Sequence, residues 1–258
     1  MLSTDGSFSC SLRQVIDSAK DWTRQLYKEK ILFDYIFSRY VVKSILESKC
    51  FSGDRLLSLM GRLDHGVGLE KDYGLYTRAI EKIQDYPMIE IIDSSIPEYK
   101  PSEHRGFPER YDALLLMDNQ LAQHANQDNL GEVLKSSYDL LIPGGIVIIE
   151  VFNYNKVLKE EFYDFSKLPL MMKEERYYMS RHMKIFDEDI LKYLVDIYDK
   201  AGHHVKSFTE LHFILTKKRL ENWLVSHGFH IEAYFGDQEM HDFEVERSPK
   251  LIVVASKL

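Results

Sequence analysis

Polar side chains that could do chemistry follow a predicted buried strand at residues 111–117. Asp118 and Asn119 come directly after this strand, and His124 lies a few residues farther on. A carboxylate and an amide can polarise an amine or hold a hydroxyl, and a histidine can take up a proton near neutral pH. Aspartate and asparagine also cap helices well, and a lone loop histidine is commonly a surface residue. The sequence therefore predicts Asp118, Asn119 and His124 as catalytic candidates, with a structural role as the open alternative.

Four more side chains are candidates for contacting a substrate, and they lie next to or within the segment 155–213. They are Tyr154, Tyr178, His182 and His212. His212 has an apolar neighbour on each side, so in an extended strand it points either into a pocket or to solvent. No histidine has the carboxylate or cysteine spacing of a metal site, and two cysteines cannot form a multi-cysteine one. No metal is predicted.

The elements that must position these residues begin with helices. Apolar residues recur at helical spacing through residues 8–50, and Ser52-Gly53-Asp54 interrupts the pattern. The short apolar run 55–60 then indicates a buried strand. Farther along, the pattern predicts a helix at 73–83, a strand at 88–92, a strand at 111–117, a helix at 128–141 and a strand at 146–151.

The unit from 111 to 151 is the clearest, because strand, helix and strand follow one another within about forty residues. Its strands are continuously apolar, which is typical of a parallel crossover buried on both faces. Residues 154–213 instead suggest antiparallel strands with a turn at 199–202. Thr216 caps a helix that runs through Ser226, and two final strands are expected at 231–235 and 251–255. The predicted fold class is α/β, with an inserted antiparallel sheet.

Composition limits the possible partners. The formal net charge is −8, so attraction to nucleic acid or to an anionic membrane is not expected. The longest apolar stretch, 140–152, is interrupted by Pro143-Gly144-Gly145 and is too short to span a bilayer. With no signal peptide evident, we expect a cytoplasmic protein with a small-molecule substrate and, as one option, a homodimer. The final Ser-Lys-Leu is a weak peroxisomal signal, relevant only in a eukaryote.

Four segments of the second half follow the order of a known family. They are the strand that opens Tyr111-Asp112, the Leu140-Leu141-Ile142-Pro143-Gly144-Gly145 turn, the helix ending in Gly228-Phe229, and the last strand Ile252-Val253-Val254-Ala255. In this order they resemble the class I S-adenosylmethionine-dependent methyltransferases, and the likeness covers residues 51–258. The segment 155–213 is similar to the substrate lid of the glycine N-methyltransferase type.

The resemblance implies a doubly wound, mostly parallel, Rossmann-like sheet with an antiparallel last strand, and S-adenosylmethionine as the cofactor. It implies a helical cap at 1–50, a core at 51–154 and 214–258, and a substrate lid at 155–213. The residues that would hold the cofactor are Leu59, Gly61, Glu70, Asp93, Ser94 and Met117.

The first half departs from the family pattern. After its first strand the family has an acidic residue and a Gly-x-Gly-x-Gly loop, because only glycine lets the backbone approach the cofactor closely. When the run 55–60 is taken as that strand, Ser58 falls at the acidic position. Met60, Arg62 and Asp64 then fall where the glycines belong.

Two alignments of residues 60–95 remain open. In the first, 66–70 is the second strand, Glu70 binds the ribose hydroxyls, and Asp93-Ser94 lies beside the adenine. This alignment leaves only residues 61–65 for a parallel crossover that needs about a dozen. In the second, the loop runs from Gly61 to Glu70, the helix after it is the crossover, and Asp93 is the ribose acid.

Two functions follow from the resemblance. One is an active methyltransferase acting on a small-molecule amine or hydroxyl, and the other is a non-catalytic binding or scaffolding protein that kept the fold. A Rossmann oxidoreductase is a weaker third reading, because no Gly-x-Gly-x-x-Gly opens a helix here.

Overall fold

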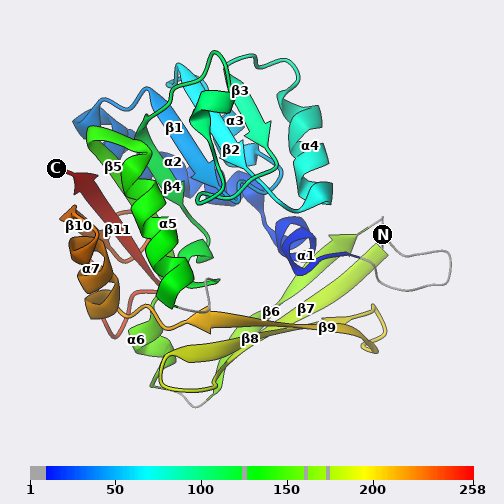
Figure 1. Cartoon of the computed structure of the whole chain (residues 1–258). Coiled ribbons are helices and arrows are strands. Elements are labelled where there is room, and N and C mark those ends of the chain that lie inside the picture. Colours follow the sequence, from blue (N-terminus) through cyan, green and yellow to red (C-terminus); the bar gives the residue numbers. More distant parts are fainter. Residues whose placement is uncertain (1–9, 124–126, 160–161, 173–174) are drawn as a thin grey trace.

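The computed structural model describes residues 10–123, 127–159, 162–172 and 175–258 (Figure 1). Its helices are α1 (Leu12–Ala19), α2 (Trp22–Tyr40), α3 (Asp54–Leu59), α4 (Tyr73–Ile83), α5 (Gln127–Asp139), α6 (Tyr154–Val157) and α7 (Lys217–Ser226), with the 3₁₀ turns η1 (Pro101–Glu103) and η2 (Gln120–Gln123). Its strands are β1 (Ser44–Ser48), β2 (His65–Leu69), β3 (Ile89–Ile92), β4 (Tyr111–Leu116), β5 (Leu141–Phe152), β6 (Phe162–Met172), β7 (Glu175–Ile185), β8 (Ile190–Tyr198), β9 (His204–Phe213), β10 (Phe229–Phe235) and β11 (Lys250–Lys257).

The larger sheet has seven strands in the order β10-β11-β5-β4-β1-β2-β3. Strands β1 to β5 pair in parallel, whereas β11 runs antiparallel to both β5 and β10. The chain starts in the middle of this sheet, builds outward through β2 and β3, and then crosses to β4 on the other side of β1. This arrangement confirms the predicted doubly wound sheet with an antiparallel last strand.

The sheet is buried on both faces, which explains its continuously apolar strands. In β1, Ile45 packs on the side of α2, α3 and α4, whereas Leu46 packs on the side of α1, α5 and α7. Both side chains are fully buried. Figure 1 shows α5 and α7 together over one face of the sheet.

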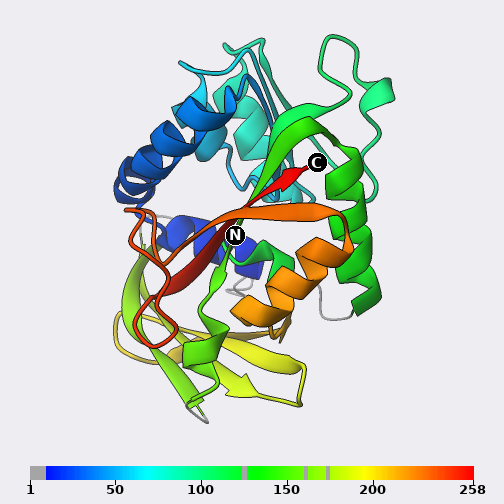
Figure 2. The same ribbon diagram turned by 90° about the vertical axis from the view of Figure 1, so that its left-hand side faces the viewer.

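The second sheet has four antiparallel strands in the order β6-β7-β8-β9. Strand β8 alternates strictly between buried and half-buried residues, so one face of this sheet belongs to the core. That face packs against α1 and η2, beyond the carboxyl ends of the parallel strands (Figures 1 and 2). No helix in the described parts of the chain is long and apolar enough to cross a membrane.

The first strand is not where the sequence pattern predicted it. Residues 44–48, expected within the helical cap, form the central strand β1, and most of the run 55–60, expected as a strand, forms helix α3. The apolar spacing of α2 continues into β1 without a break, and the backbone reverses only at Val41, which has a left-handed φ of 48°. A six-residue apolar run does not distinguish a strand from a short helix, and here Leu56 and Leu59 are buried one helical turn apart.

Moving the first strand settles the alignment of residues 60–95. Strand β2 ends at Leu69 and pairs with β1, so Glu70 follows the second strand, as the first alignment predicted. The objection to that alignment disappears, because the crossover from β1 to β2 spans residues 49–64 and includes α3. The loop over 61–70 in the second alignment is wrong, because residues 65–69 form β2.

Candidate functional site

The crevice expected to hold a ligand lies at the carboxyl ends of β1 and β4, where the strand order reverses. Glu47 in β1 is the acidic residue of the family pattern, and the loop after it places Lys49, Phe51 and Gly53 at the three glycine positions. All three have left-handed backbones, with φ of 45°, 55° and 78°. The loop therefore has the shape of a glycine loop although Lys49 and Phe51 carry side chains, at a strain on the order of 1 kcal/mol for each of these two residues.

The Phe51 side chain fills the space above this loop. Its ring is almost completely buried, with the Arg13 guanidinium carbon 4.4 Å and the Lys20 Nζ 4.0 Å from the ring centroid. The indole of Trp22 meets the same ring edge-on at 6.0 Å. Three side chains from the start of the chain thus pack over the loop, in a cation–aromatic layer.

Glu70, the acid at the end of β2, is buried and hydrogen-bonded. Its Oε2 accepts a hydrogen bond from Arg13 Nη2 at 2.5 Å and one from the Phe51 backbone N–H at 3.0 Å. Its Oε1 accepts from the Asp72 N–H at 2.9 Å. Both oxygens of this carboxylate are therefore bound within the protein.

A buried ion cluster lies behind the loop and is centred on Arg55. The fully buried guanidinium contacts three carboxylates, those of Glu29, Glu47 and Asp118. Burial raises the pKa of Glu47 to about 7, and Arg55 opposes that shift.

Asp118, the third carboxylate of this cluster, also forms an ion pair with Lys20 Nζ at 2.8 Å. Burial opposes ionisation of Asp118, but Lys20 and Arg55 prevail and hold its pKa far below the usual range. The two cations therefore hold Asp118 in its ionised form.

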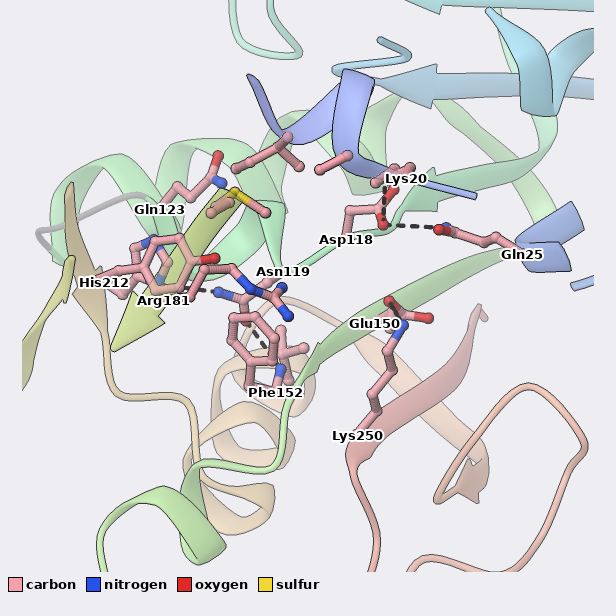
Figure 3. A pocket seen from close by; sticks show the side chains of 15 residues that line it. Lys20, Gln25, Asp118, Asn119, Gln123, Glu150, Phe152, Arg181, His212 and Lys250 are labelled. Atoms are coloured by element: carbon pink, nitrogen blue, oxygen red, sulfur yellow. Dashed lines mark hydrogen bonds and ion pairs between the residues drawn. The ribbon is translucent and has the colours of Figure 1, made fainter. Parts of the chain in front are cut away.

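An open cavity of about 200 Å³ adjoins this cluster (Figure 3). It lies at the carboxyl ends of β4 and β5, and the second sheet contributes Met179, Arg181, Tyr193 and His212 to its wall. Figure 3 shows Lys20 and Gln25 directed at Asp118, and Glu150 directed at Lys250. The Lys250 Nζ lies 2.6 Å from Glu150 Oε1, so Lys250 with Glu150 and Lys20 with Asp118 form two ion pairs in the wall.

Asn119 connects the two sheets at this cavity. It has a left-handed φ of 62°, a conformation that asparagine tolerates well. Its Nδ2 donates to Tyr154 Oη at 3.0 Å and lies 3.1 Å from His212 Nδ1, and its Oδ1 accepts from the Phe152 N–H at 3.0 Å. The buried amide thereby fixes the position of the His212 side chain, from β9, relative to the end of β5.

His212 is held on its other sides too. Its ring stacks on Tyr193 with 5.0 Å between centroids, and its Nε2 lies 3.3 Å from Glu210 Oε2. Because Nδ1 accepts from Asn119, the neutral ring carries its proton on Nε2 and donates to Glu210. Both ring nitrogens are therefore engaged within the protein, Nδ1 by Asn119 and Nε2 by Glu210.

The structure brings some of the predicted site residues together. Asp118, Asn119 and His212 line the cavity, and Tyr154 lies directly behind Asn119. Glu70 follows β2 and Ser94 follows β3, both at the carboxyl edge, with an exposed Asp93 between β3 and Ser94. His124 lies outside the described residues.

Other predicted site residues lie elsewhere. Leu59 is buried at the end of α3, and Gly61 precedes β2, at the opposite edge of the sheet from the crevice. The side chain of Met117 is buried in the core on the side of α2 and α3. Tyr178 and His182 alternate with the buried Tyr177 and Met183, so they face away from the cavity. Their positions differ from those expected because the first strand lies earlier in the chain than predicted and because the strand parity of β7 was unknown.

Sequence reasoning missed several residues of the site. Lys20, Arg181, Tyr193 and Lys250 line the cavity without any local motif. Lys49 and Phe51 could have been found, because an acid followed two, four and six residues later by Lys49, Phe51 and Gly53 has the spacing of the glycine loop. Arg13 carries no sequence signal, since it reaches the loop only through the packing of α1.

No family model matches this chain, and no curated protein matches it in sequence. Solved structures match its fold over nearly the whole length. A sugar N-methyltransferase, KedS8 from Streptoalloteichus, superposes with a TM-score of 0.70 at 14% identity, covering 100% of this chain and 98% of its own. An S-adenosylmethionine-dependent methyltransferase from Clostridium acetobutylicum gives 0.69 at 14% identity and 95% coverage of both chains.

A third neighbour was solved with S-adenosylmethionine bound. It is CalS10, an amino pentose methyltransferase from Micromonospora echinaspora, with a TM-score of 0.65 and 14% identity over 98% of this chain and 99% of its own. At this identity the likenesses establish the fold of the chain.

S-adenosylmethionine can be tested against the residues present. Glu70 and Ser94 stand at the strand ends where the fold offers polar partners to a nucleoside. The space above the loop is taken, however, by the Phe51 ring and the Arg13 guanidinium, and Arg13 also holds Glu70. As packed here these residues do not fit the cofactor, which could enter only if Arg13 and Phe51 vacated the groove.

Proposed function

We propose that this chain is an S-adenosylmethionine-dependent methyltransferase that acts on a small polar acceptor, with an amine as the favoured nucleophile. The observation that carries the proposal is the open cavity at the carboxyl ends of β4 and β5, walled by the second sheet. The KedS8 and CalS10 structures, whose fold this chain shares, act on sugars by their titles, which favours an amino-sugar-like acceptor. The cavity is of the size that holds a small molecule.

His212 is the proposed proton acceptor. An ammonium must lose a proton before its nitrogen can act as a nucleophile. His212 borders the cavity, and Glu210 lies beside its Nε2 to pair with the imidazolium. The proton would enter at Nδ1, which must first give up its hydrogen bond from Asn119. Asn119 and Tyr193 orient the ring.

The test is methyl transfer from labelled S-adenosylmethionine to a panel of amino sugars and simple amines. We expect His212→Gln to reduce turnover at neutral pH by about 10²-fold or more, with part of the loss recovered at higher pH, where the free amine is already present. Tyr178→Phe, on the opposite face of the second sheet, is the matched control and should retain full turnover. If His212→Gln is as active as the unmodified chain, His212 is not the base.

A second function is favoured by one specific observation, the filled groove above the loop. In that reading the chain binds a small molecule in the cavity and transfers no methyl group, since fold alone does not fix function. Calorimetry with S-adenosylhomocysteine decides between the two. Absence of binding at millimolar ligand, in the unmodified chain and in variants with an opened groove, would leave only the non-catalytic reading.

A further inference from the structure

We propose that α1 is an intramolecular plug of the cofactor groove, which competes with the cofactor through Arg13. The inference rests on the proposed function, because a plug implies that the groove can be used. It assigns a regulatory role to α1, in addition to its packing of Leu12 and Val15 in the core. The contact that carries this role joins Arg13, Phe51 and Glu70 and covers the loop after β1.

Helix α1 is docked at the end of β2 by its first turn. Ser11 and Gln14 both donate hydrogen bonds to the carboxylate of Asp72, the second from Gln14 Nε2 at 2.7 Å. The fit at Gly74 is close, since a Cβ there would lie 2.5 Å from Gln14 Nε2. These contacts place α1 across the residues that follow β2, at the position where the fold binds a ribose.

Arg13 makes the competing contact. Its Nη2 bonds Glu70 Oε2 at 2.5 Å and the carbonyl oxygen of Lys49 at 3.2 Å, and its guanidinium covers Phe51. The Glu70 carboxylate then has one of its roughly four acceptor positions left, too few for both hydroxyls of a ribose. A cofactor that binds Glu70 must therefore displace Arg13, so the two occupants exclude each other.

The closed arrangement is also incompletely satisfied. Arg13 Nε and Nη1 are buried and have no hydrogen-bond partner among the described residues. Buried donors without partners oppose the closed state. A plug with these defects can be displaced by a ligand that satisfies the same groups better.

The experiment measures the affinity for S-adenosylhomocysteine by calorimetry in four chains: unmodified, Arg13→Ala, Arg13→Ala with Phe51→Gly, and Arg62→Ala. Arg62 pairs with Asp34 on the surface, away from the groove, and is the matched control. Because apparent affinity is reduced by the fraction of closed molecules, we expect Arg13→Ala to bind about tenfold more tightly. The double variant should bind more tightly still, and Arg62→Ala should equal the unmodified chain.

A second readout does not depend on affinity. Amide hydrogen exchange across Leu12–Ala19 should become faster when S-adenosylhomocysteine binds the unmodified chain, because the plug is released. If the unmodified chain binds S-adenosylhomocysteine and Arg13→Ala binds it equally or less tightly, the proposal of a plug is wrong. The methyltransferase proposal then still stands. If no folded variant binds, both proposals fail. A cooperative thermal transition in each variant establishes that it is folded.

Discussion

The two halves of the crevice, which meet at the carboxyl ends of β1 and β4, differ in what occupies them. On the side of β4 and β5 the polar groups face an open cavity, and Asn119 distributes its hydrogen bonds among Tyr154, His212 and the backbone of Phe152. On the side of β1 and β2 the groove is filled by Phe51 and Arg13. The backbone scaffold is common to both sides, so the difference lies in a few side chains.

This difference shows that a loop can take the left-handed shape of a glycine loop with side chains at two of its three positions. Lys49 and Phe51 keep the left-handed φ values suited to glycine, although their side chains disfavour them. The surrounding strands impose the loop shape, since the Cys50 N–H bonds the Leu69 carbonyl at 3.0 Å and the Phe51 N–H bonds Glu70. Loop geometry alone is therefore weak evidence for a working cofactor site.

The largest expected effect comes from Arg55, which joins the two sides through Glu47 and Asp118. Arg55→Met should lower the free energy of unfolding by about 3–5 kcal/mol, because it leaves three carboxylates in the interior without their shared cation. Urea denaturation at pH 7 measures the loss. Part of it should return near pH 5, where the carboxylates can take up protons.

The control is Arg62→Met, which removes a half-exposed pair with Asp34 and should cost less than about 1 kcal/mol. Equal losses in the two variants would mean that the buried cluster is no more important than a surface ion pair. The two sides of the crevice would then be independent of each other.

The second prediction separates Phe51 from Lys49 on the filled side. Phe51→Gly should lower stability by about 2–3 kcal/mol, because the loss of a buried ring outweighs the relief of backbone strain. Lys49→Gly relieves the same strain while removing only a partly buried side chain, so its stability should change by less than about 1 kcal/mol. Thermal and urea unfolding of both variants test this pair. A stabilising Phe51→Gly would contradict the idea that the ring holds the groove closed.

The third prediction addresses the open side. Asn119→Ala should cost about 1–2 kcal/mol, because the buried Tyr154 hydroxyl and Phe152 N–H lose their partner and alanine disfavours a left-handed φ. Asn119→Asp keeps the oxygen that accepts from the Phe152 N–H but lacks the amide donor to His212. Its loss of stability should therefore come only from the missing donor contacts. Urea unfolding of both variants measures this. Equal stability of Asn119→Ala and the unmodified chain would show that the amide does not join the two sheets.

Much of the scaffold was accessible from sequence, and the reason is periodicity. The continuous apolar strand at Tyr111–Leu116, the helix after it and the Thr216 cap of α7 all follow local rules, and each is found as expected. The strand β1 was missed because Ser-Ile-Leu-Glu-Ser is short and follows a helical apolar pattern without a turn residue. Its function as the central strand is decided by pairing with β2 and β4, which are distant in sequence.

The candidate site was less predictable for the same physical reason. Asp118 and Asn119 were found because residues after a parallel strand lie at a known edge of the sheet. Arg13, Lys20 and Lys250 reach the crevice from elements whose packing no local pattern specifies. The face on which Tyr178 and His182 lie was not predictable, since a shift of one residue in a strand moves every side chain to the other face.

The smallest expected effect is a pH dependence on the filled side. Burial lowers the pKa of Lys49 to about 8 from its usual 10.5, helped by the nearby charge of Arg13. The folded chain therefore releases this proton at lower pH than the unfolded chain, and between these two values the unfolded chain binds more protons. Stability should rise with pH across that interval, relative to a Lys49→Gln variant that cannot titrate. Because Lys49 is only partly buried, the difference between the two chains should be on the order of 1 kcal/mol.

Urea unfolding at closely spaced pH values measures this pH dependence, and the comparison with Lys49→Gln cancels the titration of all other groups. Parallel stability curves for the two chains would place the Lys49 amine in water, and the filled groove would then end at Phe51.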